Sequence, residues 1–329
     1  MPDRAARRHR VFRGVLVAAL ALAGAPAGAA TGFDAWLEGV RKEARERGLK
    51  EATIVSALSD IRPIARVVEL DRKQPEFKLT LDQYLTRVVS KARVEKGRAR
   101  LAEHRDLLRR VSAKYNVQPR FIVALWGIET DFGRHLGGFP VIQALASLAF
   151  DGRRSAYFRK ELFNALTIVD QGHIAAKAMM GSWAGAMGQN QFMPSSFLRY
   201  AVDYDGDGRR DIWGTQADIF ASSANYLSKV GWRGDQTWGR RVRLPEGFDR
   251  SLAGLKIRKG LNDWQRLGVR LPDGSDLPRR NLRSSILLPG GVNGPPYVVY
   301  DNFRAILRWN RSNLFATAVG SLADRIAGG

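Results

Sequence analysis

One glutamate, Glu129, lies among apolar residues at a spacing that places it on a shared helix face. Within residues 120–133, Ile122, Leu125, Trp126 and Glu129 recur at i, i+3, i+4 and i+7. Because apolar surroundings disfavour an ionised carboxylate, we expect the pKa of Glu129 to be raised toward neutrality. Such a group can serve as a general acid at neutral pH. The alternative is a glutamate at a helix end whose head reaches water or an arginine.

No second acid is well placed to assist Glu129. Between residues 117 and 231 the only other glutamate is Glu161, and its neighbours Arg159 and Lys160 predict a position on a solvated face. Asp131 follows Glu129 by two positions, so it points away if the helix continues. Glycosidases that retain or invert by the usual routes need two carboxylates. A site with Glu129 alone therefore requires the substrate to supply the rest.

A second candidate is the glycine-rich and aromatic segment 181–196. Glycines allow a close approach to a ligand, and Trp183 and Phe192 can stack on a sugar face. Ser182 and Gln191 can form hydrogen bonds with hydroxyl or amide groups. The same composition also fits a tight packing corner between helices.

A third candidate is the acidic segment 203–211, which has aspartates at positions 1, 3, 5 and 9 of an EF-hand-like loop and Gly208 at position 6. Hard oxygen ligands at this spacing suit Ca²⁺. Position 12 is Gly214 instead of the usual glutamate, and the nearest later acid is Asp218. Any metal here is structural, since catalysis is assigned to Glu129 and needs no cofactor. The alternative is a turn rich in aspartate and glycine whose charge Arg209 and Arg210 neutralise.

The first residues have the order of a secretory signal peptide. Arginines between positions 4 and 13 precede an apolar run over 15–25 and the small residues Ala27-Gly28-Ala29. We expect cleavage after Ala29 and a soluble, periplasmic protein. The alternative, a membrane anchor, is disfavoured because the apolar run is shorter than the roughly 20 residues that span a bilayer.

The composition excludes several chemistries and favours a polyanionic partner. The chain has no cysteine, so it has no disulfide, thiolate nucleophile or acylated lipoprotein cysteine, and its four histidines form no metal or triad motif. The formal net charge of +21 attracts polyanions. For an exported protein these are cell-wall polymers or lipid head groups, and the export signal argues against nucleic acid. A generically basic solvated surface is the alternative.

Periodicity predicts the elements that position these residues. Three-to-four spacing predicts helices over most of 33–117, around 121–130 and 157–169, and again from Asn302, where Phe315, Val319, Leu322 and Ile326 form one stripe. Short runs at 241–244 and 285–288, broken by Pro and Gly, predict a small strand-and-turn module. A helix that resumes after this module suggests that it is inserted into a helical core.

Several motifs in order make the chain similar to the lytic murein transglycosylase B family. They are Glu129-Thr-Asp-Phe-Gly133, Ala184-Gly-Ala-Met-Gly188, Gln191-Phe-Met-Pro-Ser195 and Ala201-Val-Asp-Tyr-Asp-Gly-Asp-Gly208. The resemblance runs from about Phe33 to the C-terminus. It implies a mainly α fold of the α+β type, with a lysozyme-like helical core, an N-terminal helical domain and a small inserted β domain. The expected boundaries are a signal peptide (1–29), an N-terminal helical domain (30–117), a catalytic core (118–232 and 297–329) and a β domain (233–296).

The resemblance also implies the reaction and the residues that support it. The residue matching Glu129 protonates the leaving oxygen between N-acetylmuramic acid (MurNAc) and N-acetylglucosamine (GlcNAc). It then assists attack by the muramic C6 hydroxyl, with help from the N-acetyl group, so a 1,6-anhydro sugar forms and one carboxylate is enough. The implied substrate contacts are Ser182, Gln191, Tyr226, Asn310 and Tyr84. The implied calcium ligands, in a lengthened loop, are Asp203, Asp205, Asp207, the Arg209 carbonyl and Asp218.

Departures from the family pattern leave the chemistry in place but affect fine specificity. Thr130 replaces the more usual Ser, and Trp309 and Phe315 stand where Tyr is frequent. Tyr84 and Tyr226 can alternatively be core aromatics, and Asn310 a helix cap. Two other functions stay open: a muramidase that hydrolyses the same bond, and a non-catalytic wall-binding protein. The expected partners are peptidoglycan glycan strands and, beyond them, cell-wall enzyme complexes.

Overall fold

The structure is a computed structural model, and it describes residues 27–73, 79–291 and 294–328. The described part is mainly helical with short antiparallel strands, as the sequence predicts. Its α-helices are α1 (Ala27–Glu46), α2 (Glu51–Leu58), α3 (Ala65–Arg72), α4 (Leu81–Val88), α5 (Lys91–Glu103), α6 (Arg105–Tyr115), α7 (Pro119–Thr130), α8 (Val141–Phe150), α9 (Ser155–Asp170), α10 (Pro194–Tyr200), α11 (Gln216–Lys229), α12 (Leu261–Arg266), α13 (Asp301–Trp309) and α14 (Asn313–Ile326). Its strands are β1 (Phe139–Pro140), β2 (Met180–Gly181), β3 (Gly239–Arg241), β4 (Lys259–Gly260), β5 (Arg283–Leu287) and β6 (Tyr297–Val299).

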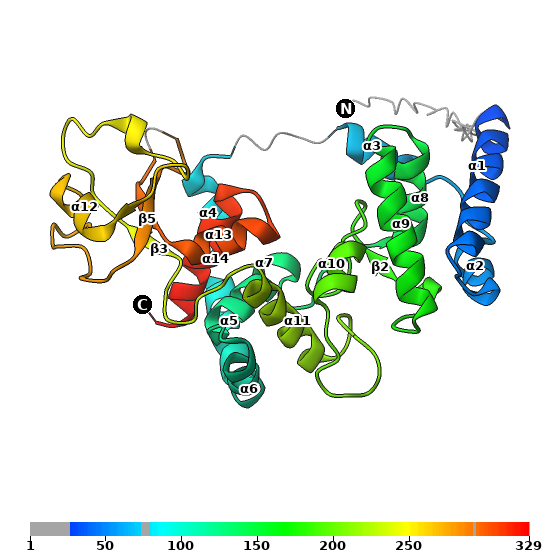
Figure 1. Cartoon of the computed structure of the whole chain (residues 1–329), viewed down its shortest axis with the longest axis horizontal. Coiled ribbons are helices and arrows are strands. Elements are labelled where there is room, and N and C mark those ends of the chain that lie inside the picture. Colours follow the sequence, from blue (N-terminus) through cyan, green and yellow to red (C-terminus); the bar gives the residue numbers. More distant parts are fainter. Residues whose placement is uncertain (1–26, 74–78, 292–293, 329) are drawn as a thin grey trace, which may run out of the picture.

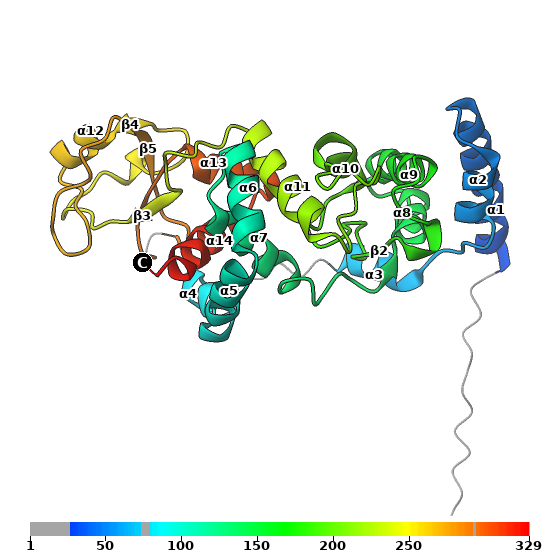
Figure 2. The same cartoon turned by 90° about the horizontal axis from the view of Figure 1, so that it is seen from below.

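Within the described residues, three hydrophobic clusters follow one another along the long axis of the molecule (Figure 1, Figure 2). The outer lobe contains α1–α3 and α8–α10. The central lobe contains α4–α7, α11, α13 and α14. The β module contains β3–β6 and α12, and it lies at the end of the molecule opposite α1 and α2.

The helices of the predicted N-terminal domain, residues 30–117, do not share one hydrophobic cluster. Phe33 and Leu37 of α1 are buried in the outer lobe, where α2 packs against α9. Leu108 and Val111 of α6 are buried in the central lobe, where α5 and α6 pack against α7. The apolar faces of these helices thus have two different partners, and the proposed domain boundaries stay a prediction.

Helix α7 is the buried axis of the central lobe because its sequence is apolar on nearly every side. Residues 121–127 are all buried, and α5, α11 and α14 pack around them. Pro119 occupies the first turn, where its missing N–H leaves no bond unmade. Asp131 ends the helix in a left-handed conformation with φ of 50°. Glu129 therefore lies in the last turn, at the edge of the core.

Two helices predicted from apolar stripes are confirmed. The segment predicted around 157–169 is α9, with Phe158, Leu162 and Leu166 buried in the outer lobe. The stripe predicted at the C-terminal end lies on α14, and all four of its apolar residues are buried against the central lobe. Helix α9 packs against α8 and α10 in the outer lobe, and α14 packs against α7 in the central lobe.

The β module is a small antiparallel sheet with strand order β3-β6-β5-β4. Its own core includes Trp264, Ile286 and Val298. The runs predicted as strands at 241–244 and 285–288 are strands only in part, because β3 ends at Arg241 and β5 ends at Leu287. In chain order the module lies between α11 and α13, two helices of the central lobe.

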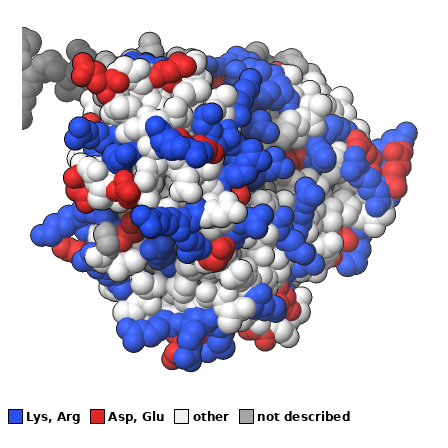
Figure 3. Space-filling view, turned by 60° about the vertical axis from the view of Figure 1, so that its left-hand side comes forward, with Lys and Arg blue, Asp and Glu red and all other residues white. Residues whose placement is uncertain are grey.

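Positive charge is abundant on the surface around the β module. Lys and Arg side chains spread over the face that this end of the molecule presents, with fewer Asp and Glu among them (Figure 3). Arg241, Arg243 and Arg250 of the module are all exposed. The high net charge is therefore displayed at the surface, where a polyanion can reach it.

Among the described residues, no helix combines the length and apolar character needed to cross a bilayer. The predicted signal peptide, residues 1–29, falls almost wholly on residues 1–26, which lie outside the described part of the chain.

Candidate active site

Glu129 is half-buried at the end of α7 and is held by a tryptophan from a distant segment. Nε1 of Trp309, the last residue of α13, donates a hydrogen bond of 2.8 Å to Oε1 of Glu129. Ile122, Leu125 and Trp126, the predicted apolar neighbours on the same helix, are all buried. The prediction that Glu129 extends from an apolar helix is confirmed.

Burial raises the pKa of Glu129 from 4.5 to about 7. The hydrogen bond from Trp309 acts in the opposite direction, because it favours the charged form. A carboxyl group with this pKa is protonated in part of the molecules and ionised in the rest at neutral pH. It can therefore donate a proton in one step and accept one in the next.

Asp131, the nearest acid in sequence, is engaged elsewhere. Its carboxylate Oδ2 accepts a hydrogen bond from Lys96 Nζ at 3.2 Å, and Arg93 and Arg134 lie at ion-pair distances of 3.7 Å and 3.4 Å. The left-handed backbone at Asp131 directs its side chain toward these cations instead of continuing the helix. Asp131 thus fixes the end of α7 and leaves Glu129 as the acid of this site.

Four aromatic side chains form a continuous group next to Glu129, which we call the aromatic wall: Phe192, Tyr200, Tyr226 and Trp309. The ring centroids of Tyr226 and Trp309 are 4.8 Å apart, and those of Phe192 and Trp309 are 5.1 Å apart. The ring centroid of Tyr200 lies 4.3 Å from that of Tyr226. The wall fixes the orientation of Trp309 and, through its N–H, that of the Glu129 carboxylate.

Tyr226, a predicted substrate contact, is largely buried within this wall. Its hydroxyl donates a hydrogen bond of 2.6 Å to the backbone oxygen of Arg308. Burial raises the pKa of the Tyr226 phenol to about 12. The phenol therefore stays protonated at physiological pH and cannot act as a base.

Two further predicted contacts, Tyr84 and Asn310, are connected to the site in different ways. Burial and, after it, the charge of Glu129 raise the pKa of the Tyr84 phenol, which indicates that the two groups are neighbours. Asn310 follows Trp309, is exposed, and accepts a hydrogen bond from the backbone N–H of Ser312 at 3.0 Å. Asn310 is therefore the C-terminal cap of α13, which agrees with the alternative prediction of a helix cap. Its side chain is exposed to solvent next to Trp309.

The glycine-rich loop 181–196 is tightly packed and supplies fewer free groups than its sequence suggests. The Ser182 hydroxyl accepts a hydrogen bond of 3.0 Å from the Ala186 N–H, and the Gln191 amide donates to the backbone oxygens of Leu136 and Gly188. Among the described residues, neither side chain forms a hydrogen bond with Glu129. Their predicted role as substrate contacts therefore stays a prediction.

The expectation that Phe192 offers a ring face to a sugar is wrong. Phe192 is only 2 % exposed, because it packs against Tyr226 and Trp309 inside the aromatic wall. Its role is to support Trp309. Trp183 remains half-buried and available.

Gln189, a residue to which its local sequence assigns no function, joins the glycine-rich loop to α7. Its side-chain oxygen accepts a hydrogen bond of 2.7 Å from Trp126 Nε1, and its amide donates to the backbone oxygen of Trp213. The local sequence of Trp309 likewise predicts no contact with Glu129, although Trp309 lies within a family motif. Both contacts connect residues far apart in sequence, which explains why local spacing does not reveal them.

The expectation that Glu161 lies on a solvated face is wrong. Glu161 is 2 % exposed, and its carboxylate accepts a hydrogen bond of 2.8 Å from the backbone N–H of Ser195. Ser195 lies in the first turn of α10, where an acid is favourable because the N–H groups of that turn have no partner in the helix. Glu161 therefore joins α9 to α10 and is no rival to Glu129.

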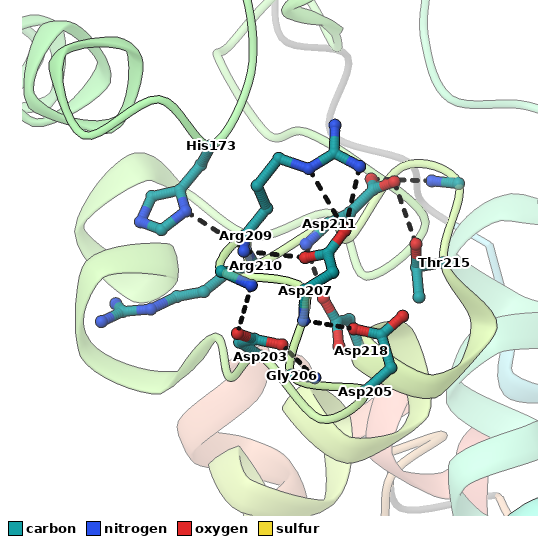
Figure 4. Close-up of polar contacts among 12 residues, drawn as sticks. His173, Asp203, Asp205, Gly206, Asp207, Arg209, Arg210, Asp211, Thr215 and Asp218 are labelled. Atoms are coloured by element: carbon teal, nitrogen blue, oxygen red, sulfur yellow. Dashed lines mark hydrogen bonds and ion pairs between the residues drawn. The ribbon is translucent and has the colours of Figure 1, made fainter.

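The acidic loop brings three of its predicted ligands together (Figure 4). Oxygen atoms of Asp203, Asp205 and Asp218 lie within 4.8 Å of one another. Asp218 is fully buried and accepts hydrogen bonds of 2.7 Å from the backbone N–H groups of Tyr204 and Asp211. Burial raises the pKa of Asp218, and the charges of Asp203 and Asp205 raise it further.

The other predicted ligands are arranged differently. The Asp207 carboxylate is paired with Arg209, whose Nη2 lies 2.9 Å from Oδ2, and is outside the group of three (Figure 4). Asp211, at loop position 9, instead accepts hydrogen bonds from the backbone N–H groups of Trp213 and Gly214. The turn at Gly208 has a φ of 88°, the left-handed conformation that position 6 requires.

Comparison with known proteins identifies the family of the chain. The family model described as "Transglycosylase SLT domain" matches residues 32–324. Membrane-bound lytic murein transglycosylase B of Escherichia coli (strain K12) is 33% identical over 252 residues, which cover 74% of this chain and 67% of that protein. SltB3 from Pseudomonas aeruginosa, solved in complex with NAG-anhNAM-pentapeptide, is 47% identical with a TM-score of 0.88, covering 90% of this chain and 80% of the other. Escherichia coli SLT35 in complex with calcium is 28% identical with a TM-score of 0.76, covering 90% and 92%.

The chain therefore belongs to the transglycosylase SLT domain family. It is an enzyme, a lytic transglycosylase that cleaves peptidoglycan. The predicted family and the lysozyme-like, mainly helical fold class are both confirmed.

Proposed function

We propose that Glu129 is the single catalytic acid and base, and that it cleaves the β-1,4 bond between MurNAc and GlcNAc with formation of a 1,6-anhydro-MurNAc end. The observation that carries this proposal is the pKa of about 7 of a carboxyl group that stands without a second carboxylate beside it in the described structure. Hydrolytic glycosidases of the usual kinds need two such groups. A reaction in which the substrate supplies its own nucleophile needs one.

The steps balance without water. Protonated Glu129 gives its proton to the glycosidic oxygen, and the bond between that oxygen and C1 of MurNAc breaks with the electron pair leaving on GlcNAc. The N-acetyl oxygen of MurNAc supports the electron-poor C1. The Glu129 carboxylate then takes the proton of the C6 hydroxyl while the oxygen of that hydroxyl bonds to C1. This step closes the anhydro ring and restores protonated Glu129.

Five residues are proposed as substrate contacts around Glu129: Ser182, Gln191, Tyr226, Asn310 and Tyr84. Tyr84 is supported by the effect of the Glu129 charge on its pKa, and Asn310 by its exposed position directly after Trp309. Tyr226 and Gln191 contribute chiefly van der Waals contacts with the sugar, because their polar groups already donate hydrogen bonds to backbone oxygens. Ser182 is in the turn that also positions the half-buried Trp183.

Digestion of purified sacculi tests the proposal directly. Wild-type protein should release muropeptides with 1,6-anhydro ends, and Glu129→Gln should release almost none. Glu95→Gln, which makes the same change at an exposed position on α5, is the matched control and should behave as wild type. Reducing ends that have gained one water would indicate a muramidase instead. Intact binding with no cleavage by wild type would indicate a wall-binding protein.

We further propose a structural Ca²⁺ at the acidic loop. The donor set fits, because it offers hard carboxylate oxygens that converge from Asp203, Asp205 and the buried Asp218. Asp207 and the Arg209 carbonyl complete the set if Asp207 leaves its ion pair. The ion would offset the repulsion among the three carboxylates and hold the loop against α11. A related enzyme, SLT35, was crystallised with calcium.

The proposed location is the periplasm, reached by the N-terminal signal peptide and without a stable membrane anchor. The order of the first 29 residues supports export, and the positive surface supports binding to a polyanion. For an exported protein that polyanion is the cell wall and not nucleic acid. Other cell-wall enzymes are the proposed protein partners.

A further inference from the structure

A cavity of about 310 Å³ lies where the β module meets the central lobe. The turn after α11, one face of α13 and the residue before β4 form its walls. Neither Glu129 nor any side chain of the aromatic wall lines it among the described residues, so the cavity is separate from the catalytic site. Its charged lining residues are four arginines and one acid, and we call it the arginine pocket: Arg233, Arg258, Asp301, Arg304 and Arg308.

The single carboxylate of the arginine pocket is shared between two of the arginines. Asp301 Oδ1 accepts a hydrogen bond from Arg258, and Asp301 Oδ2 lies 3.7 Å from Nε of Arg233. One negative charge therefore faces four positive charges, which leaves the described lining with an excess of three. Like charges held this close repel one another unless an anion lies between them.

The other two arginines have no acidic partner within the described residues. Arg304 donates hydrogen bonds to neutral oxygens, the Leu255 backbone oxygen at 2.6 Å and the Ser285 hydroxyl at 2.8 Å. Arg308 is exposed, and its side chain forms neither an ion pair nor a hydrogen bond with any described residue. Burial and, after it, the charge of Arg258 lower the pKa of Arg304. The positive charge of the pocket is thus incompletely balanced by the protein itself.

One buried donor of the pocket lining also lacks an acceptor. Nε of Arg258 is buried and has no hydrogen-bond partner among the described residues, although Nη2 of the same guanidinium bonds to Asp301. A buried donor that is left unpaired is costly, and more so on a charged group. An unsatisfied guanidinium in the wall of a cavity is the kind of group that a bound anion satisfies.

We propose that the arginine pocket binds a phosphate group with two negative charges, either a free phosphate or the end of a larger molecule. Guanidinium groups match phosphate oxygens through pairs of N–H donors, and a tetrahedral dianion accepts such bonds from several directions at once. A carboxylate has one charge and two oxygens, so it leaves more of the positive excess unbalanced. The volume of the pocket lies at the lower end of the range for small-molecule sites, roughly 300–1,000 Å³. This site does not depend on the role proposed for Glu129.

Titration calorimetry of the full protein with inorganic phosphate tests the pocket. At pH 8, where phosphate carries two charges, and at constant ionic strength, phosphate should bind at least about tenfold more tightly than acetate. Arg308→Gln removes a side chain that has no described partner, and it should weaken phosphate binding about tenfold. Asp301→Asn removes the carboxylate that competes for Arg233 and Arg258, so it should tighten phosphate binding. A variant that merely folds poorly cannot show such a gain.

A matched control removes two arginines elsewhere on the surface. Arg110→Gln/Arg279→Gln changes two exposed residues outside the pocket and should bind phosphate as wild type does. Four results would overturn the proposal: no binding of phosphate by wild type, equal affinities for phosphate and acetate, an unchanged affinity in either pocket variant, or an equal loss of affinity in the control. The last result would mean that phosphate responds to the overall surface charge.

Vesicle sedimentation distinguishes the two sources of the phosphate group. Phosphatidylcholine vesicles are compared with and without phosphatidic acid, whose head group is a phosphate monoester. Retention that requires phosphatidic acid, and that falls in Arg308→Gln but not in the control, assigns the pocket to a lipid head group. Calorimetric phosphate binding without retention that depends on Arg308 assigns it to a soluble phosphate compound. Both results support the pocket and differ only in the molecule that carries the phosphate.

Discussion

Glutamine in place of Glu129 should stabilise the protein at high pH relative to wild type. The pKa of Glu129 is 4.5 in the unfolded chain and about 7 in the folded protein, so the folded state binds more protons between these values. The stability that this proton provides is fully present below the unfolded value and is lost as the pH rises through about 7. The difference between the two values corresponds to about 3 kcal/mol. Glutamine is neutral throughout and avoids this loss, while its amide oxygen can still accept the Trp309 hydrogen bond.

Urea unfolding followed by tryptophan fluorescence measures this effect. The free energy of unfolding of wild type is subtracted from that of Glu129→Gln at pH 5 and again at pH 8, so the titration of all other groups cancels. We expect this difference to rise by about 2 to 3 kcal/mol between the two pH values. Glu95→Gln, at an exposed position, should show no such rise.

Parallel stability curves for wild type and Glu129→Gln would refute the reasoning. They would mean that the Glu129 carboxylate is solvated when ionised, and that burial does not raise its pKa. A carboxyl group with an ordinary pKa would be ionised in nearly all molecules at neutral pH, and its assignment as a general acid would lose its physical basis.

Three further predictions concern the donor, the metal and the loop. Trp309→Phe removes the hydrogen bond that favours ionised Glu129, so the alkaline limb of the kcat/KM profile should move up by roughly one pH unit; an unmoved limb would contradict this. Millimolar Ca²⁺ added to chelator-treated protein should raise the Tm by several degrees, because a ligand at a hundred times its Kd adds about 3 kcal/mol to the free energy of unfolding. Asp218→Asn should abolish this rise, and scanning calorimetry that shows no rise in wild type would exclude the metal. Gly188→Ala places a Cβ 2.6 Å from Ile212 Cγ1 at a φ of 67°, so urea titration should show a loss of about 2 to 4 kcal/mol, and an unchanged midpoint would show that the loop can relax.

The sequence was informative where the controlling contacts are local. The spacing of Ile122, Leu125 and Trp126 predicts both the helix and the apolar setting of Glu129, because one helix face carries them all. The stripe on α14 follows from the same periodicity. The left-handed glycine of the acidic loop, Gly208, is likewise a local requirement of the turn.

The sequence was uninformative where partners come from distant segments. Glu161 has cationic neighbours in sequence, yet it is buried because α10 presents an N–H group to it. Phe192 lies in a segment whose composition is typical of a binding loop, yet it is buried because Tyr226 and Trp309 pack against it. Periodicity gives the apolar face of a helix but not the element that will cover it, so the division of residues 30–117 between two lobes could not be foreseen.

The hydrogen bond between Glu129 and Trp309 joins residues 180 positions apart, across the whole β module. During synthesis the ribosome makes the acid early and its donor almost last. A truncated copy that ends before α13 has the glutamate but lacks both the indole and the support of the aromatic wall. Under the proposed mechanism, such a copy would carry the acid without the group that orients it.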